Sequence, residues 1–394
     1  MTEVKSLYIH IPYCISKCKY CDFFSVPCGK KTPQVPEEYM EALSNEIIYR
    51  ISQFNIKEIE TIYIGGGTPS LLSKKQLHKI FSVIKENTLL ADNCEITIES
   101  NPDDITKELI ESWKEESINR ISLGIQSFND NALSYVSRRA SSSINKQALA
   151  LIKEYWKNDL SVDLICGLPK QDSSSFIKDL IYIGKCRPDH ISMYSLTIEE
   201  ETPLGREYYS GHLNYDFDMA DELWLLSRKT LEEIGYNHYE VSNFSLPGKE
   251  CRHNLKYWNH ESYVGCGSGG AGTVYNNDGS GSRWTNITDI NKYVSFWNNR
   301  KPSDLENLPE IKESISVETS IFEFFMMGMR KLSGVKESDF ERTFNKKIPE
   351  KILNSLNNWA EKGLCNITSC ENGNIYTLGH KGILYLNLFL EEII

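Results

Sequence analysis

Short apolar runs rich in β-branched residues alternate with longer amphipathic stretches over the first half of the chain. This alternation is typical of parallel β/α units. The short runs predict six strands, which are Leu7–Ile11, Thr61–Ile64, Glu95–Glu99, Arg120–Ile125, Val162–Cys166 and His190–Leu196. The longer stretches predict helices at Glu37–Gln53, Lys75–Lys85, Lys107–Glu115, Asn145–Lys157 and Ser174–Gly184. Six units favour a partial (β/α)6 TIM-type barrel, although periodicity alone leaves a flat doubly wound sheet open.

The pattern changes after Trp284, where the barrel units stop. The downstream segments predict a linker, three helices and a β-hairpin, in the order Pro302–Pro309, Val317–Lys331, Glu337–Phe344, Pro349–Lys362 and Gly363–Leu378. The turn of the hairpin is Glu371-Asn372-Gly373-Asn374. Helices followed by a two-stranded wing predict a small winged-helix-like domain over residues 310–394, after a barrel domain over residues 1–300.

The composition, with 40% hydrophobic and 25% charged residues, describes an ordinary globular protein. A formal net charge of −11 argues against nucleic acid as a partner, also for the winged-helix-like domain, because phosphate binding needs clustered Lys and Arg. The N-terminal stretch lacks the charged segment and apolar run of a secretory signal, and no apolar stretch reaches the length of a membrane span. We therefore expect a cytoplasmic protein that does not span a membrane.

Three cysteines, Cys14, Cys18 and Cys21, stand close together as CxxxCxxC. Free buried cysteines are usually scattered one to an element, so three on one loop look like metal ligands. A structural zinc ion or an ordinary iron–sulfur cluster takes four protein ligands, and this stretch has no local fourth. A cubane held by three cysteines keeps one iron open to a small molecule. Zinc binding or chance clustering remains the alternative.

Unusual residues follow the ends of the next predicted strands, where parallel barrels gather their reactive groups. The segment Gly65–Pro69, GGGTP, frees backbone N–H groups for a ligand, or forms an ordinary tight turn. Glu99 and Gln126 end two further strands, either toward a ligand or as satisfied polar strand ends. Arg138 could clamp a carboxylate, and Asp163 lies within an apolar strand. The alternative for this last pair is an ion pair that closes the barrel.

The cysteine motif resembles that of the radical S-adenosylmethionine (radical SAM) superfamily, and this favours the barrel over the flat sheet. From Tyr8 to about residue 385 the chain resembles the oxygen-independent coproporphyrinogen III oxidase family, and within it the haem chaperone (HemW) branch. The resemblance is carried by the segments IHIPYCISKCKYCDF, GGGTPSLL, ESNPDDIT, RISLGIQSFND, VDLICGLPKQD, YEVSNFSLPGKECRHNLKYW and GCGSGG. It implies a [4Fe-4S] cluster on Cys14, Cys18 and Cys21, with SAM chelating the open iron. It also implies cofactor contacts from Tyr8, Tyr20, Gly66, Gly67, Thr68, Glu99, Gln126, Arg138 and Asp163.

Two departures separate the chain from the oxidase pattern. Phe23 stands where the oxidase carries a further cysteine, and only thirteen residues precede Cys14, where the oxidase has a longer extension over its substrate. The segment with His253, HNxxYW, resembles the motif that marks haem-binding members of the HemW branch. A neutral imidazole can ligate haem iron while neighbouring aromatic rings pack on the macrocycle, although a hydrogen-bonded core or surface histidine is the alternative.

The resemblance thus implies a protein that binds haem and passes it to an acceptor, expected to be a respiratory and membrane-associated protein. One alternative is an oxidase that uses a 5′-deoxyadenosyl radical to decarboxylate coproporphyrinogen III. Another is a structural metal site on a carbohydrate- or nucleotide-binding barrel. The sequence leaves open whether SAM is cleaved and whether the chain forms a homodimer.

Overall fold

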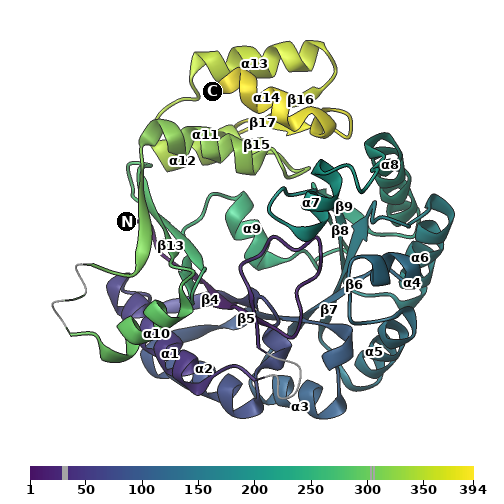
Figure 1. The fold of residues 1–394 in the computed structure, drawn as a ribbon. Helices are drawn as coiled ribbons and strands as arrows, with labels where there is room; N and C mark the ends of the chain where they lie inside the picture. The colour runs from purple at the N-terminus through teal and green to yellow at the C-terminus, as the bar shows by residue number, and fades with distance from the viewer. Residues whose placement is uncertain (29–33, 302–303, 305–306) are drawn as a thin grey trace.

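A nine-stranded sheet organises the computed structural model, which describes residues 1–28, 34–301, 304 and 307–394. The strand order is β11-β1-β4-β5-β6-β7-β8-β10-β9. The central six strands are parallel, and they are β1 (Ser6–Ile11), β4 (Glu58–Gly66), β5 (Leu89–Ser100), β6 (Arg120–Gln126), β7 (Asp159–Cys166) and β8 (His190–Ser195). Figure 1 shows the sheet curved, with helices along its outer side. The predicted partial (β/α)6 barrel is therefore confirmed.

Helices follow the barrel strands, five of them at the predicted places and three, over residues 130–135, 203–209 and 217–233, that were not predicted. They are α1 (Glu37–Gln53), α2 (Lys74–Asn87), α3 (Lys107–Glu115), α4 (Asp130–Tyr135), α5 (Ser142–Tyr155), α6 (Ser173–Cys186), α7 (Pro203–Tyr209) and α8 (Phe217–Glu233). Local chemistry sets where they begin. The Ser73 hydroxyl accepts from the backbone N–H of Gln76, whose side chain accepts from the backbone N–H of Ser73, a capping box that starts α2. Thr106 caps α3 in the simpler way, by accepting from the N–H of Leu109.

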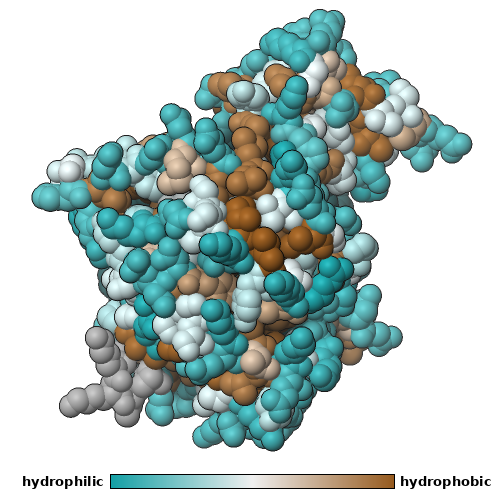
Figure 2. Space-filling model, turned by 90° about the vertical axis from the view of Figure 1, so that its right-hand side faces the viewer, coloured by the Kyte–Doolittle hydropathy of each residue, from teal (hydrophilic) through white to brown (hydrophobic). Residues whose placement is uncertain are grey.

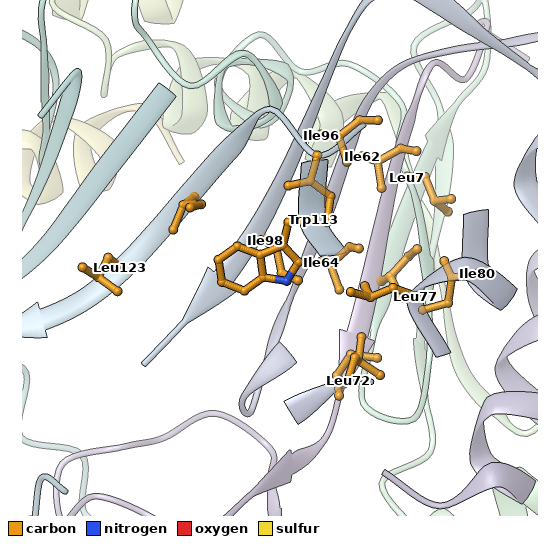
Figure 3. Close-up of a cluster of buried hydrophobic side chains, with 14 of the residues drawn as sticks. Leu7, Ile62, Ile64, Leu72, Leu77, Ile80, Ile96, Ile98, Trp113 and Leu123 are labelled. Carbon is orange, nitrogen blue, oxygen red and sulfur yellow. The ribbon is translucent and has the colours of Figure 1, made fainter. Parts of the chain in front are cut away.

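The two faces of the central strands differ in chemistry. The outer face is apolar and packs on the helices, and Figure 3 labels Leu7, Ile62, Ile64, Ile96 and Ile98 of the strands with Leu77, Ile80 and Trp113 of the helices. On the inner face polar side chains bond from strand to strand. Thr61 donates to Ser6 at 3.0 Å, and Ser122 donates to Asp163 at 2.9 Å. A parallel sheet with helices on both faces would be apolar on both, so the polar inner face belongs to a barrel interior.

Short strands extend the sheet at both edges, and the sequence analysis missed them. β11 (Val264–Cys266) runs parallel to β1, whereas β10 (Asn243–Ser245) and β9 (Asn237–Glu240) continue antiparallel from β8. A further antiparallel sheet contains β12 (Ala271–Tyr275), β13 (Gly281–Asn286) and β14 (Glu310–Ile315), with α10 (Ile290–Asn299) beside α1. These strands carry too weak an apolar pattern to be recognised from sequence.

A buried ion network joins this antiparallel sheet to α1. Arg50 of α1 pairs with Glu46 at 3.3 Å and with Glu310 of β14, and all three side chains are buried. Asn286 of β13 donates to Glu46 at 2.8 Å. Each buried charge thus has a partner, which removes most of the cost of burying it.

The C-terminal part has its own hydrophobic cluster and lies above the barrel in Figure 1. Its elements are α11 (Val317–Gly328), β15 (Val335–Lys336), α12 (Glu337–Phe344), α13 (Glu350–Glu361), β16 (Cys365–Cys370), β17 (Gly373–Leu378) and α14 (Leu386–Ile393). The three predicted helices and the hairpin are confirmed, whereas β15 and α14 were not predicted. Four positions of the predicted linker, 302, 303, 305 and 306, lie outside the described residues, and the division into residues 1–300 and 310–394 stays a prediction. None of the helices in the described chain combines the length and apolar character that crossing a bilayer requires.

Candidate functional site

The cysteine loop is closed at its base by main-chain pairing. β2 (Tyr13–Cys14) runs parallel to β3 (Val26–Pro27), and the N–H of Cys28 donates to the carbonyl of Cys14 at 2.8 Å. The middle of the loop is held as well, because the N–H of Lys19 donates to the carbonyl of Val136 at 3.0 Å. Main-chain hydrogen bonds thus fix the shape of the loop at its base and in its middle.

Polar groups from two other parts of the chain reach the cysteine sulfurs. The hydroxyl of Thr68 donates to Sγ of Cys14 at 3.3 Å, and Nη1 of Arg138 donates to Sγ of Cys18 at 3.8 Å. Burial raises the pKa of the Cys21 thiol. A metal that replaces the thiol proton would remove this cost, because thiolates are the metal-binding form.

The spacing of the sulfurs bears on the kind of metal group. In the part of the chain that the structure describes, the three sulfurs do not all lie within 4.8 Å of one another. Around one tetrahedral zinc ion with Zn–S bonds of about 2.3 Å, sulfurs would stand roughly 3.7 Å apart. A cubane binds each cysteine to a different iron, so its ligands stand farther apart. The observed spacing therefore does not match one zinc ion held by all three sulfurs.

The glycine segment after β4 lies directly on β1 and on the cysteine loop. Gly66 has φ +111°, and a Cβ there would lie 2.7 Å from the ring of His10. A Cβ on Gly67 would lie 2.7 Å from the carbonyl oxygen of Tyr13, and its N–H donates to the carbonyl of Ile11 at 2.8 Å. Only glycine permits both this conformation and this approach. The segment is thus a fitted bend beside the cysteines rather than a generic turn.

Two half-buried carboxylates face the barrel interior next to this bend. Glu99 accepts from the N–H of Gly66 at 3.0 Å and from the hydroxyl of Tyr63 at 2.9 Å. Burial, with the charge of Asp163 adding to it, raises the pKa of Glu99 to about 7. Burial also raises the pKa of Asp163, although serine hydroxyls, among them that of Ser122 at 2.9 Å, donate to it. A cationic or hydroxyl-bearing ligand would relieve both groups.

Arg138 and Gln126 converge over Gly124. A Cβ on Gly124 would lie 2.8 Å from Nη2 of Arg138 and 2.9 Å from Nε2 of Gln126, and Gln126 itself has φ +65°. Arg138 also donates to the carbonyl of Gly124. Its Nε is buried and finds no hydrogen-bond acceptor among the described residues. No ion pair with Asp163 forms in the described chain, so the barrel-closing pair considered from sequence is absent. An unused buried guanidinium donor beside Cys18 fits a ligand carboxylate.

Tyr8 and Tyr20, the two tyrosines predicted to contact the cofactors, lie beside the same residues. Tyr8 lies within hydrogen-bond distance of Nδ1 of His10, 3.0 Å, and its ring stacks on Tyr63 with centroids 6.2 Å apart. Tyr20 is adjacent to Cys18, and burial raises the pKa of its hydroxyl. With these two, the predicted cluster and SAM residues all gather at one mouth of the barrel. Their donors, acceptors and fitted glycines are compatible with a cluster plus a ligand that bears amino, carboxylate and hydroxyl groups.

His253 lies deeper than the other predicted residues, on α9 (Arg252–Trp258) against the inner face of the sheet. Its backbone N–H donates to Glu95 at 2.8 Å, and its ring packs on Tyr63 at 5.3 Å. Nδ1 lies 2.8 Å from the Thr61 hydroxyl and Nε2 lies 2.7 Å from the Tyr257 hydroxyl. Burial, with smaller contributions from nearby cations, lowers the pKa of His253 to about 3, so the ring is neutral.

Several interior groups were missed by the sequence analysis. They are His10, Tyr63, Glu95, Arg120 and His190, all on the inner face of the central strands. A signal for them exists in the sequence, because polar residues occupy every second position of SLYIHI, EITIES and HISMYS. Helices cover the outer face of these strands, yet polar and apolar residues alternate along them. Such alternation indicates a polar barrel interior.

Comparisons with known proteins agree with this geometry. A family model described as the Radical SAM superfamily matches residues 8–182. The protein named heme chaperone HemW of Lactococcus lactis subsp. lactis (strain IL1403) is 34% identical over 362 residues, covering 91% of this chain and 90% of that protein. Proteins of the same name from Buchnera aphidicola subsp. Acyrthosiphon pisum (strain APS) and Escherichia coli (strain K12) are 33% and 31% identical, each covering 98% of this chain and 97% of the relative.

A solved structure resembles the fold over nearly its whole length. Coproporphyrinogen III oxidase (HemN) from Escherichia coli, described as a radical SAM enzyme, has a TM-score of 0.80 against this chain. The two share 20% sequence identity, and the match covers 99% of this chain and 90% of that one. At this identity the likeness concerns the fold alone.

Proposed function

The chain belongs to the radical SAM superfamily and, within it, to the heme chaperone family HemW, and on this premise we propose that it binds haem and delivers it to a recipient protein. In this proposal Cys14, Cys18 and Cys21 hold a [4Fe-4S] cluster and the barrel mouth holds SAM. The acceptor would be a haem protein, of which a membrane-associated respiratory protein is the expected kind.

The residues at the mouth have separate roles in this proposal. Arg138 clamps the SAM carboxylate, because its buried Nε donor is otherwise unused in the described chain. Glu99 accepts from the amino or hydroxyl groups of SAM, and Gly66 and Gly67 let the backbone approach the ligand. A bound cluster of this kind supplies an exchangeable iron position and one-electron reduction. The protein's own contribution is to position SAM and to exclude water.

The observation that carries the haem proposal is the position of α9. Its residues Tyr257 and Trp258 line a hollow of about 310 Å³. The rest of the lining is partly aromatic or thioether and partly polar: Tyr263, Tyr275, Met326 and Met327, with Glu261, Thr273, Arg283 and Glu323. Aromatic and thioether side chains are suitable packing partners for a flat apolar macrocycle. Tyr257 lines the hollow and its hydroxyl, 2.7 Å from Nε2 of His253, occupies the position that a ligated iron would take. Ligation of haem iron by His253 thus requires the Tyr257 side chain to move aside.

Haem titration of cluster-reconstituted protein, followed by anaerobic absorption spectroscopy, tests the site. His253→Ala should lose the spectrum of histidine-ligated haem. Tyr257→Phe should keep that spectrum and bind haem at least as tightly, because it frees Nε2 without removing the ring. His78→Ala, which changes an exposed histidine paired with Glu116, is the matched control and should bind as the parent does.

The haem titration tests the identity of the haem ligand and the chaperone proposal separately. Unchanged haem binding by His253→Ala would remove that residue as the ligand, and a parent protein that takes up no haem would end the chaperone proposal. A second assay supplies SAM, a reductant and coproporphyrinogen III without oxygen. Formation of a vinyl-bearing product would replace the chaperone proposal with the oxidase.

A further inference from the structure

Three potential metal ligands from distant parts of the chain meet at one place. Glu232 lies at the end of α8, His238 lies in β9, and His380 follows β17 in the C-terminal part. One ligand atom from each residue lies within 4.8 Å of those from the other two. The cluster is separate from the cysteine loop and from the barrel mouth, and nothing in the proposed function uses it.

The protonation of His238 leaves a lone pair available. Its Nε2 lies 3.4 Å from the carbonyl oxygen of Val241, which can only accept, so Nε2 carries the proton. In the neutral ring Nδ1 then holds the lone pair. Nδ1 is buried and has no hydrogen-bond partner among the residues described, and only 8% of the residue is exposed. An unpaired buried acceptor costs free energy that a bound cation would recover.

A ring with one nitrogen bonded to a backbone carbonyl and the other unpaired is suited to bind a metal. In such sites the ligating nitrogen faces the metal while the other ring N–H donates to a backbone carbonyl or a carboxylate. The carbonyl of Val241 takes that second position for His238. The ring is also fixed from one side, since it stacks on Phe244 with centroids 4.5 Å apart.

The other two ligands leave the site open to solvent. Nε2 of His380 lies 3.7 Å from Oε1 of Glu232, and their side chains are 51% and 36% exposed. The rings of His238 and His380 are nearly parallel, at an interplanar angle of 18° with centroids 6.1 Å apart. Arg228 adds a positive charge nearby and donates to the carbonyl of His380 at 3.4 Å, which holds that residue in place but limits affinity for a cation.

We propose that Glu232, His238 and His380 bind a divalent transition-metal ion, Zn²⁺ in particular, with water in the fourth position. Two imidazoles, a carboxylate and a water make a set that suits tetrahedral zinc and is a poor set for Mg²⁺ or Ca²⁺. The bound ion fastens the segment after the wing to the barrel.

The metal would reinforce a junction that β9 already makes. Tyr239 accepts at its carbonyl from the N–H of Leu332 at 3.0 Å, and Glu240 bridges to Lys331 in the same C-terminal part. Figure 2 shows the side of the molecule on which α8 lies, with hydrophobic side chains gathered between the upper C-terminal part and the main body. Leu225 and Leu226 of α8 are exposed. A metal beside such a junction controls how firmly the C-terminal part is held.

Zinc binding by the cluster-loaded protein tests the proposal, because loading the cluster occupies the cysteine ligands equally in every variant. Equilibrium dialysis against Zn²⁺, followed by metal analysis, should find one more zinc per chain in the parent than in His380→Asn. Glu232→Gln should weaken binding at least tenfold. Both replaced residues are partly exposed, so these variants should fold. His78→Asn, which removes an exposed histidine beside a single glutamate, should bind zinc as the parent does.

Thermal unfolding gives a second reading of the same site. Added Zn²⁺ should raise the midpoint temperature of unfolding of the parent and of His78→Asn, but not that of His380→Asn. An ion that binds only the folded state stabilises the folded state. Mg²⁺ at the same concentration should raise none of them. Equal zinc contents in the parent and His380→Asn, or a parent that takes up no zinc, would overturn the proposal. Neither reading depends on haem.

Discussion

The backbone N–H of Gly66 donates to Oε2 of Glu99 at 3.0 Å, between the ends of the adjacent strands β4 and β5. The contact joins the glycine bend to the carboxylate of Glu99, and both were predicted from sequence to contact SAM. Because a Cβ on Gly66 would lie 2.7 Å from the ring of His10, the same position also lies against β1. The bend and the carboxylate therefore act as one unit.

Gly66→Ala should destabilise the protein and lower its affinity for SAM. The new Cβ would meet the His10 ring at 2.7 Å in a backbone conformation, φ +111°, that alanine rarely adopts. Gly211→Ala is the matched control, since Gly211 has φ +76° with nothing within 4 Å of a Cβ. The control should cost about 1–2 kcal/mol for the left-handed backbone alone. Denaturant unfolding should show a larger loss for Gly66→Ala, and equal losses would mean that the His10 contact is unimportant.

Glu99→Gln should change how stability depends on pH in the absence of SAM. The pKa of Glu99 in the folded protein is about 7, above its ordinary value of 4.5, so the folded state holds the proton more tightly than the unfolded state. The stability that this proton contributes is complete below about pH 4.5 and is lost as the pH rises through about 7. Glutamine has no proton to lose. Relative to the parent, the variant should therefore gain about 2–3 kcal/mol between pH 5 and pH 8.

Unfolding curves at a series of pH values measure this difference. Glu86→Gln, at an exposed position of α2, is the control and should follow the parent at every pH. A parent and a Glu99→Gln variant whose stabilities run parallel over this range would show that Glu99 is ionised throughout.

Cys18→Ser should lose the cluster, whereas Cys28→Ser should keep it. Cys28 is only partly exposed and its N–H donates to Cys14 at 2.8 Å, yet it lies outside the CxxxCxxC motif. Thiolates bind iron–sulfur clusters far better than hydroxyls do. Iron and sulfide analysis after anaerobic reconstitution measures the result. Loss of iron in Cys28→Ser to the level of Cys18→Ser would mean that a fourth cysteine takes part.

Arg138→Lys should weaken SAM binding by roughly tenfold or more, because lysine cannot donate from a planar fork. The guanidinium reaches both Sγ of Cys18 and the carbonyl of Gly124, which one ammonium group cannot do from the same stem. Arg139→Lys is the neighbouring control, since Arg139 pairs with Asp103 and Asp104 at 2.9 and 3.0 Å away from the sulfurs. Calorimetric titration with SAM compares the two. Similar affinities would remove Arg138 from the site.

Arg50→Met should destabilise the fold by roughly 3–5 kcal/mol, because it leaves buried carboxylates without their cation. Glu46 and Glu310 are both buried and both pair with Arg50. Lys79→Met, which breaks a more exposed pair with Glu41, should change stability by about 1 kcal/mol or less. Denaturant unfolding of both variants measures the contrast, and a small effect at Arg50 would mean that the carboxylates become protonated instead.

The sequence alone determined the barrel strands, most of their helices and the cysteine loop. These features depend on local periodicity and spacing: α3 was predicted at its observed bounds, Lys107–Glu115, because an N-cap and an amphipathic pattern set both ends. Residues at the ends of parallel strands were predictable for a related reason, since such strands present their carboxyl ends at one edge.

Only the tertiary structure decided which groups surround His253 and which groups meet at His238. Thr61 and Glu95 contact His253 from two distant strands, and edge strand β11 pairs with β1 across more than half of the chain. Glu232 and His238 approach His380 in the same way. Such contacts carry no local pattern, because they depend on how packed elements are placed and not on the spacing of residues along the chain.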